Sequence, residues 1–103
     1  MDFIDVAGAS GASYRFRRVD PDALPPMGGN VVVVESTASP QRYLLCGAAR
    51  SLYRAASRVD AALKASTASR LYIRLNVART TREAEHADIV AAVQPDADLP
   101  DLD

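Results

Sequence analysis

Three arginines are the residues whose type and spacing could most readily do chemistry in this chain. Arg50, Arg54 and Arg58 recur every four residues, so on a helix they lie on one side, about 6 Å apart along the axis. A row of guanidinium groups at that spacing suits the phosphates of a nucleic acid. Arg74, on the polar face of a later strand, is a further candidate. A solvated helix face explains the row equally well, and both interpretations stay open.

The other chemistry-bearing residue types do not form a familiar site. The single cysteine and single histidine, Cys46 and His86, stand forty residues apart, whereas a structural zinc needs several such ligands. Cys46 lies within an apolar strand, which favours an inert core thiol. His86 falls on a helix as a packed or surface residue. Gly8 and Gly11 lack the third glycine and the helix of a phosphate-binding loop.

Composition describes one ordinary globular domain. The 103 residues are 49% apolar and 24% charged, and no apolar run approaches the ~20 residues that a membrane helix requires. A lone cysteine cannot form an internal disulfide, which favours the cytoplasm. Residues 14–94 hold twelve basic and seven acidic residues, a net charge of +5, while residues 95–103 hold four aspartates and no base.

Apolar patterning predicts an α+β fold: a small three-stranded, mostly antiparallel sheet with packed helices. The β-branched run 31–34 predicts a strand buried on both faces, 43–46 its hairpin partner and 71–77 a third strand. Helical periodicity over 51–64 and 81–93 predicts two helices, the first capped by Ser51 and the second by the box Thr80-x-x-Glu83. Tyr14 to Arg17 predicts a short edge strand.

The expected organisation has three parts. Residues 1–13 are rich in Gly, Ala and Ser and predict a flexible N-terminal segment. Residues 14–95 form the single domain. Residues 96–103 form an acidic tail, which we expect to be disordered when free.

The order of these elements resembles the GIY-YIG nuclease family. The residues that carry the resemblance are Leu24-Pro25, Gly28-Gly29 with the Val31 strand, Tyr43 to Leu52 with its glycine at Gly47, Leu71 to Leu75, and Glu85-x-x-Asp88-Ile89-Val90 before Pro95. The resemblance covers about residues 24–95. It implies a hairpin, a helix, a third strand and a terminal helix that carries a glutamate.

The resemblance also implies catalytic positions, and most of them are altered here. The family uses a tyrosine on each hairpin strand and an arginine on the first helix, positions that correspond to Val31, Leu45 and Ala55 in this chain. Only Glu85 matches the family's metal-binding glutamate. We therefore expect a degenerate, non-cleaving domain without a cofactor.

Two functions follow as hypotheses. The first is a non-catalytic module that binds nucleic acid or a protein partner, with Arg50, Arg54, Arg58 and Arg74 as the nucleic-acid contacts. The alternative is an endonuclease with a rearranged site, in which Glu85 holds Mg²⁺ or Mn²⁺, Arg54 or Arg58 stabilises charge, and Tyr43 supplies a displaced hydroxyl. That alternative places Tyr43 on the same strand face as Leu45, two residues away. Glu85 also has a simpler explanation, as a solvated carboxylate on the surface of a helix.

Overall fold

The computed structural model describes residues 2–37 and 40–103. The fold is a six-stranded mixed sheet with one helix on each face. Its elements in chain order are β1 (Phe3–Ala7), β2 (Ser13–Arg18), the 3-10 turn η1 (Pro21–Ala23), β3 (Gly29–Glu35), β4 (Arg42–Ala49), α1 (Ala56–Leu63), β5 (Ser69–Leu75), α2 (Arg79–Val93) and β6 (Ala97–Leu99). The strand order is β1-β2-β5-β3-β4-β6, and every pairing is antiparallel except β4 with β6.

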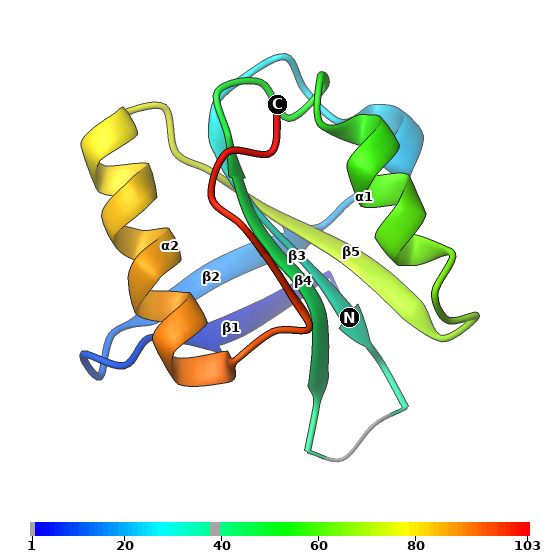
Figure 1. Ribbon diagram of the computed structural model, residues 1–103, viewed down its shortest axis with the longest axis horizontal. Helices are drawn as coiled ribbons and strands as arrows, with labels where there is room; N and C mark the ends of the chain where they lie inside the picture. Colours follow the sequence, from blue (N-terminus) through cyan, green and yellow to red (C-terminus); the bar gives the residue numbers. More distant parts are fainter. Residues whose placement is uncertain (1, 38–39) are drawn as a thin grey trace.

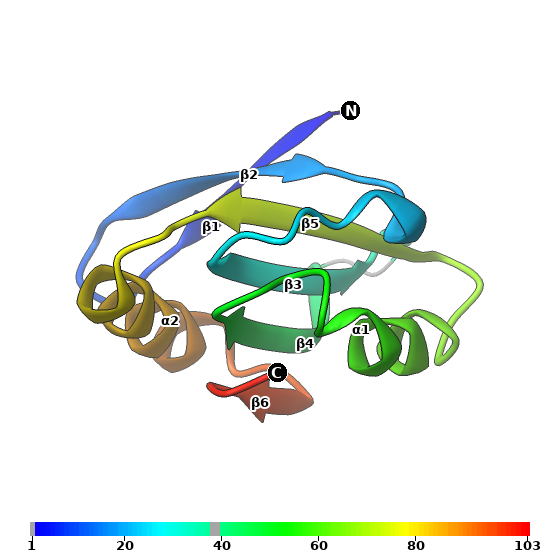
Figure 2. The same ribbon diagram turned by 90° about the horizontal axis from the view of Figure 1, so that it is seen from above.

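The predicted α+β class is confirmed, but the predicted three-stranded sheet is wrong. The three expected strands form the middle of the sheet as β5, β3 and β4, with β3 and β4 paired as the expected hairpin. The error lies in the flanking segments, which contribute β1 and β2 on one side and β6 on the other (Figure 2). Residues 38 and 39 of the hairpin loop lie outside the described residues.

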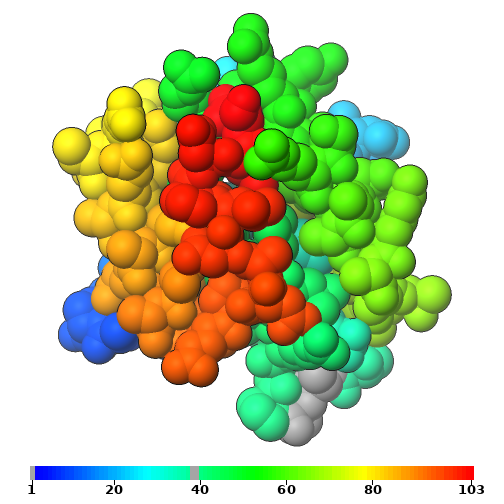
Figure 3. Space-filling model, viewed as in Figure 1, coloured from blue at the N-terminus to red at the C-terminus, as the bar shows by residue number. Residues whose placement is uncertain are grey.

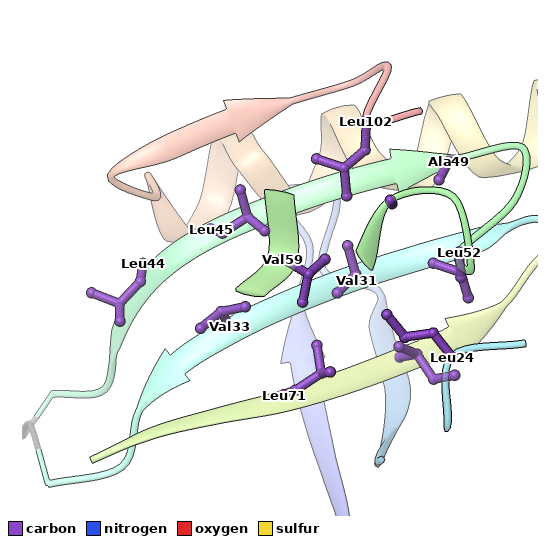
Figure 4. Close-up of a cluster of buried hydrophobic side chains, with 12 residues drawn as sticks. Leu24, Val31, Val33, Leu44, Leu45, Ala49, Leu52, Val59, Leu71 and Leu102 are labelled. Carbon is purple, nitrogen blue, oxygen red and sulfur yellow. The ribbon is translucent and has the colours of Figure 1, made fainter. Parts of the chain in front are cut away.

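The central strand β3 is buried on both faces, as its run of valines predicts. Val31 and Val33 pack with Val59 of α1 (Figure 4), while Val32 and Val34 pack in a second cluster with Ile89 of α2. Because successive side chains of a strand point to opposite faces, a strand with no polar face needs a cover on both sides. The two helices supply it from opposite sides of the sheet (Figure 1).

The N-terminal residues form a hairpin in place of the expected flexible segment. Ile4 and Val6 of β1 stand opposite Phe16 and Tyr14 of β2, and Val6 and Phe16 are fully buried. The small residues between the strands close a tight turn, in which Gly8 N donates to Ala12 O (2.8 Å). Gly11 takes a positive φ of 92° there, which glycine adopts without steric cost. The small residues that predicted a flexible linker therefore form the turn between β1 and β2.

The acidic residues 96–103, expected to be disordered, are an ordered part of the sheet. Ala97 to Leu99 pair in parallel with Leu45 to Gly47, and Leu102 is 1% exposed within the core cluster under α1 (Figure 4). Gly47 makes room for it, since a Cβ at that position would lie 3.0 Å from a Leu102 methyl carbon. Figure 3 shows this segment lying between the residues of α1 and those of α2.

Both helices begin differently from the sequence prediction. Residues 52–55 form a turn, so α1 starts at Ala56, and Ser51 accepts from Arg54 N (3.4 Å) within that turn. Helix α2 starts at Arg79, one turn before Glu83, with no side-chain cap at Ala78. The predicted capping box is therefore wrong: Glu83 pairs with Arg79 instead (3.2 Å). No helix among the described residues is long and apolar enough to span a membrane.

Asp88 of α2 fastens the β1–β2 turn to the helix. Its carboxylate accepts from the main-chain N of Ser10 (2.8 Å), the Ser10 hydroxyl (2.7 Å) and the Tyr14 hydroxyl (2.7 Å). The Ser10 and Tyr14 hydroxyls hold the pKa of Asp88 below its ordinary value. The hairpin is thus attached through a charged group as well as through its apolar side.

We predict that Leu102→Ala lowers the free energy of unfolding by about 2–5 kcal/mol, because it deletes a fully buried side chain and leaves a cavity. Urea denaturation monitored by circular dichroism measures the change. Leu75→Ala, at a leucine that is 45% exposed, serves as the control and should cost much less. Equal costs for the two variants would show that residues 96–103 do not pack on the core.

Acid stability should depend on Asp88. Because its folded pKa is lowered, the stability it contributes is present at neutral pH and is lost as the pH falls below the ordinary value of about 3.9. Asp88→Asn should therefore lower the urea midpoint at pH 7 and make the decrease between pH 5 and pH 3 smaller. The half-exposed Asp60, paired with Lys64, gives the control variant Asp60→Asn. A pH profile unchanged by Asp88→Asn would contradict the assignment.

Candidate anion-binding cleft

Three arginines converge on one cleft at the end of the sheet. It has a volume of about 500 Å³ and is formed by the end of β4, the first turns of α2 and the segment after β6. The lining residues are Ala48, Ala49, Arg50, Arg79, Arg82, Glu83, Pro100 and Asp101. Three guanidinium groups against two carboxylates leave the lining with a net positive charge.

Arg82 is the unusual member of this cleft because it is only 5% exposed. Its Nη1 donates to the main-chain oxygens of Asn76 (3.1 Å) and Val77 (3.0 Å). Among residues 2–37 and 40–103, no carboxylate lies within ion-pair distance of it. Buried arginines are ordinarily paired with an anion, so Arg82 is a fixed positive charge whose partner the described residues do not supply.

Glycine at position 28 permits this placement. A Cβ there would lie 2.6 Å from Arg82 Nη1 and 3.3 Å from Asn76 O, so any larger residue would push the guanidinium off the carbonyl groups that hold it. The close approach of the loop to α2 explains why the chain carries Gly28 before the central strand.

Arg79 and the start of α2 add to the positive potential. Arg79 pairs with Glu83 one turn away, but both side chains are more than half exposed, at 75% and 52%. Such a pair contributes only about 0.3–0.5 kcal/mol, so Arg79 can turn toward a bound anion at little cost. The first N–H groups of α2 lack a side-chain cap and carry the positive end of the helix dipole.

Arg50 also lines a second, shallower cleft of about 390 Å³, together with Pro26, Ser51, Arg54 and Asp103. There the Asp103 carboxylate accepts from the main-chain N of Arg50 (3.0 Å) and of Ser51 (3.0 Å). Burial opposes its ionisation, yet these two N–H donors and the Arg50 charge hold the pKa of Asp103 below its ordinary value. The chain therefore already binds one of its own anions at this site.

Glu85, the proposed metal ligand, belongs to a hydrogen-bonded network beside the first cleft. Its Oε1 accepts from Arg74 Nε (2.9 Å) and from Asn76 Nδ2 (2.9 Å). Arg74 also lies 5.5 Å from the centre of the Tyr14 ring. Arg74, a predicted nucleic-acid contact, is thus compensated by Glu85.

The network continues from Glu85 to the buried arginine. Asn76 Nδ2 also donates to Asn30 Oδ1 (3.0 Å), and Asn30 Nδ2 donates to Arg82 O (3.1 Å). Asn30 is 1% exposed at the start of the valine strand. These bonds fix the first turns of α2 against β3 and β5, and so they fix where Arg82 lies. An asparagine directly before four valines is the sequence signal for this polar junction.

The structure does not bring Tyr43, Arg54 and Arg58 to Glu85. Arg58 lies on α1 and Arg54 in the turn before it, and α1 covers the face opposite to α2. Tyr43 accepts through its main-chain oxygen from Asp96 N (3.0 Å), beyond the end of α2, whereas Glu85 contacts the strands from the first half of that helix.

The expectation that Tyr43 shares a strand face with Leu45 is wrong. Val33 pairs with Leu45 and Val34 with Tyr43, so Leu44 is the extra residue of a β-bulge. The bulge turns Tyr43 to the α2 face, while Leu45 packs in the cluster under α1. Burial raises the pKa of the Tyr43 hydroxyl, so the hydroxyl is less readily ionised to the phenolate that could act as a base.

Cys46 and His86 are both buried, as the sequence predicted for the thiol and allowed for the imidazole. Burial raises the pKa of Cys46 to about 12, so the thiol is unreactive. His86 is buried and its Nε2 lies 2.7 Å from Asp98 Oδ1 of β6. No group of three or more His, Cys, Asp or Glu side chains that could hold a metal ion is found in the part of the chain that the structure describes.

The chain matches no protein-family model, and no curated protein or solved structure is significantly similar to it. The GIY-YIG resemblance therefore stays a prediction.

We predict that Glu85→Ala lowers the free energy of unfolding by about 1–3 kcal/mol, because it leaves Arg74 and Asn76 without their shared acceptor. Glu83→Ala, two residues away on the same helix and in an exposed pair, is the matched control and should cost under about 0.5 kcal/mol. Urea denaturation of the two variants gives the comparison. Similar small costs would mean that Glu85 has no structural role and is available for a ligand.

Proposed function

We propose that this chain is a non-catalytic module that binds nucleic acid through its phosphates in the cleft of Arg50, Arg79 and Arg82. The observation that carries the proposal is the buried guanidinium of Arg82, which faces a positively charged cleft and has no carboxylate partner among the described residues. We keep the cytoplasm as the proposed compartment, because the lone cysteine Cys46 is a free thiol.

The geometry of Arg82 suits a phosphate group. Two main-chain carbonyl groups already hold one end of the guanidinium, so its remaining N–H groups are oriented before a ligand arrives. A planar fork of this kind binds two phosphate oxygens at once. Because the side chain is already fixed, little conformational entropy is lost on binding.

The second cleft extends the path available to a polyanion. Arg50 lines both clefts, and Arg54 lies beside it in the second one. Arg58 follows on α1, exposed to solvent. The predicted helical row is wrong, because Arg58 alone of the three arginines lies on α1. Arg50 and Arg54 support the proposal by lining the clefts, whereas Arg74 is occupied by Glu85 and is left out of the proposed contacts.

Binding is favoured over phosphodiester cleavage. The Glu85 oxygen that would hold a metal already accepts two hydrogen bonds, and Tyr43, Arg54 and Arg58 lie away from it. The cleft itself offers Glu83 and Asp101 as its carboxylates, and Glu83 is paired with Arg79.

Fluorescence anisotropy with a labelled oligonucleotide, titrated at several salt concentrations, tests the proposal. Replacing Arg50, Arg79 and Arg82 together by Gln should weaken binding at least tenfold at low salt. It should also reduce the slope of log K against log[salt] by up to about 2.1–2.7, since each lost phosphate contact removes ~0.7–0.9.

The matched control replaces Arg15, Arg17 and Arg18 of β2 by Gln, the same change in charge on exposed residues at the other side of the sheet. Should the control lose as much affinity as the cleft variant, the cleft is not the binding site. A double variant of Arg50 and Arg79 alone, both exposed, repeats the test without disturbing the buried arginine. If the wild-type chain and its variants bind no oligonucleotide even at low salt, the proposal fails.

A further inference from the structure

We infer that the Pro100–Asp103 segment is an intramolecular competitor for the phosphate sites, so that its aspartates regulate access to them. The inference rests on the proposed function. The observation behind the inference is that one short acidic segment lies against both arginine clefts. Asp101 lines the first cleft and Asp103 lines the second.

Leu102 holds the two aspartates in place. Its side chain is buried in the core under α1, and its main-chain N donates to Ala48 O (2.9 Å). Because this central residue is anchored, its two neighbours stand at the protein surface on either side of it. The segment lies between the residues of α1 and those of α2 (Figure 3).

The strand before the segment strengthens this placement. Asp96 pairs with Arg42 (2.6 Å), and Asp98 meets His86 (2.7 Å). These two aspartates have partners away from the clefts, so they fasten β6 and do not compete. Of the four acidic residues in 95–103, only Asp101 and Asp103 line the arginine clefts.

Asp103 occupies its site as a ligand would. Each of its two carboxylate oxygens accepts from one main-chain N–H, those of Arg50 and Ser51, with the Arg50 and Arg54 side chains lining the same cleft. Two adjacent N–H donors beside arginines form an anion site that suits a phosphate as well as a carboxylate. A phosphate group brings more acceptor oxygens and more charge than the carboxylate it would replace.

Displacement requires only a small motion. The Asp103 side chain can rotate away from the N–H groups while Leu102 stays in the core, so the sheet remains intact. The competition therefore lowers the affinity of the folded protein for polyanions without unfolding any element.

The experiment measures binding of the same labelled oligonucleotide to a variant with Asp101→Asn and Asp103→Asn. Removal of two carboxylates beside the phosphate sites should raise affinity about 5- to 30-fold at low salt, on the estimate that one close charge in a solvated site changes affinity about fivefold. The control variant has Asp2→Asn and Asp5→Asn, the same change in charge near the opposite edge of the sheet, and should raise affinity less than about twofold.

The outcomes distinguish the competition by Asp101 and Asp103 from the proposed function. A gain confined to the Asp101 and Asp103 variant supports the competition. If the wild-type chain binds through its arginine cleft and the variant binds no better, or no better than the control, the competition is wrong and the proposed function stands. If neither the wild-type chain nor the variant binds, the proposed function is overturned and the inference with it.

Discussion

Burial of β3 on both faces is the constraint on which the rest of the structure depends. Four successive valines leave the strand without a polar face, so it can be stable only inside a sheet with a cover on each side. Strands β5 and β4 flank it, and α1 and α2 cover it from opposite faces. Asn30, the second residue of the same strand, ties the start of α2 to the sheet. The strand that organises the core thus also sets the position of the arginine cleft.

A buried guanidinium without a carboxylate partner is costly, and the surrounding structure offsets only part of that cost. The carbonyl groups of Asn76 and Val77 satisfy one nitrogen of Arg82, while its charge faces the cleft. Loss of solvation disfavours such a group when the cleft is empty, and a bound anion would compensate it. The physical chemistry of this one residue therefore links the stability of the fold to the function that we propose.

The local sequence pattern was sufficient to predict those helices and strands whose type depends on a few neighbouring residues. Strand β3 has a continuous β-branched run and helix α2 has apolar residues at helical spacing, and the sequence placed both elements. Strand β6 has no such signal, because it is three residues long and is held by pairing with β4 and by Leu102. The bulge at Leu44 and the burial of Arg82 likewise depend on contacts between distant segments. The sequence could indicate that arginines such as Arg50 matter, but not that Arg50 meets Arg79 and Arg82 in a cleft.

An NMR titration of the ¹⁵N-labelled chain with an unlabelled oligonucleotide tests the central claim most directly, since it locates the binding site residue by residue. We expect the largest amide shifts at residues 49–51 and 78–83, around the two ends of the cleft, and little change along β1. Uniform small shifts, or the largest shifts along β1 and β2, would contradict the account.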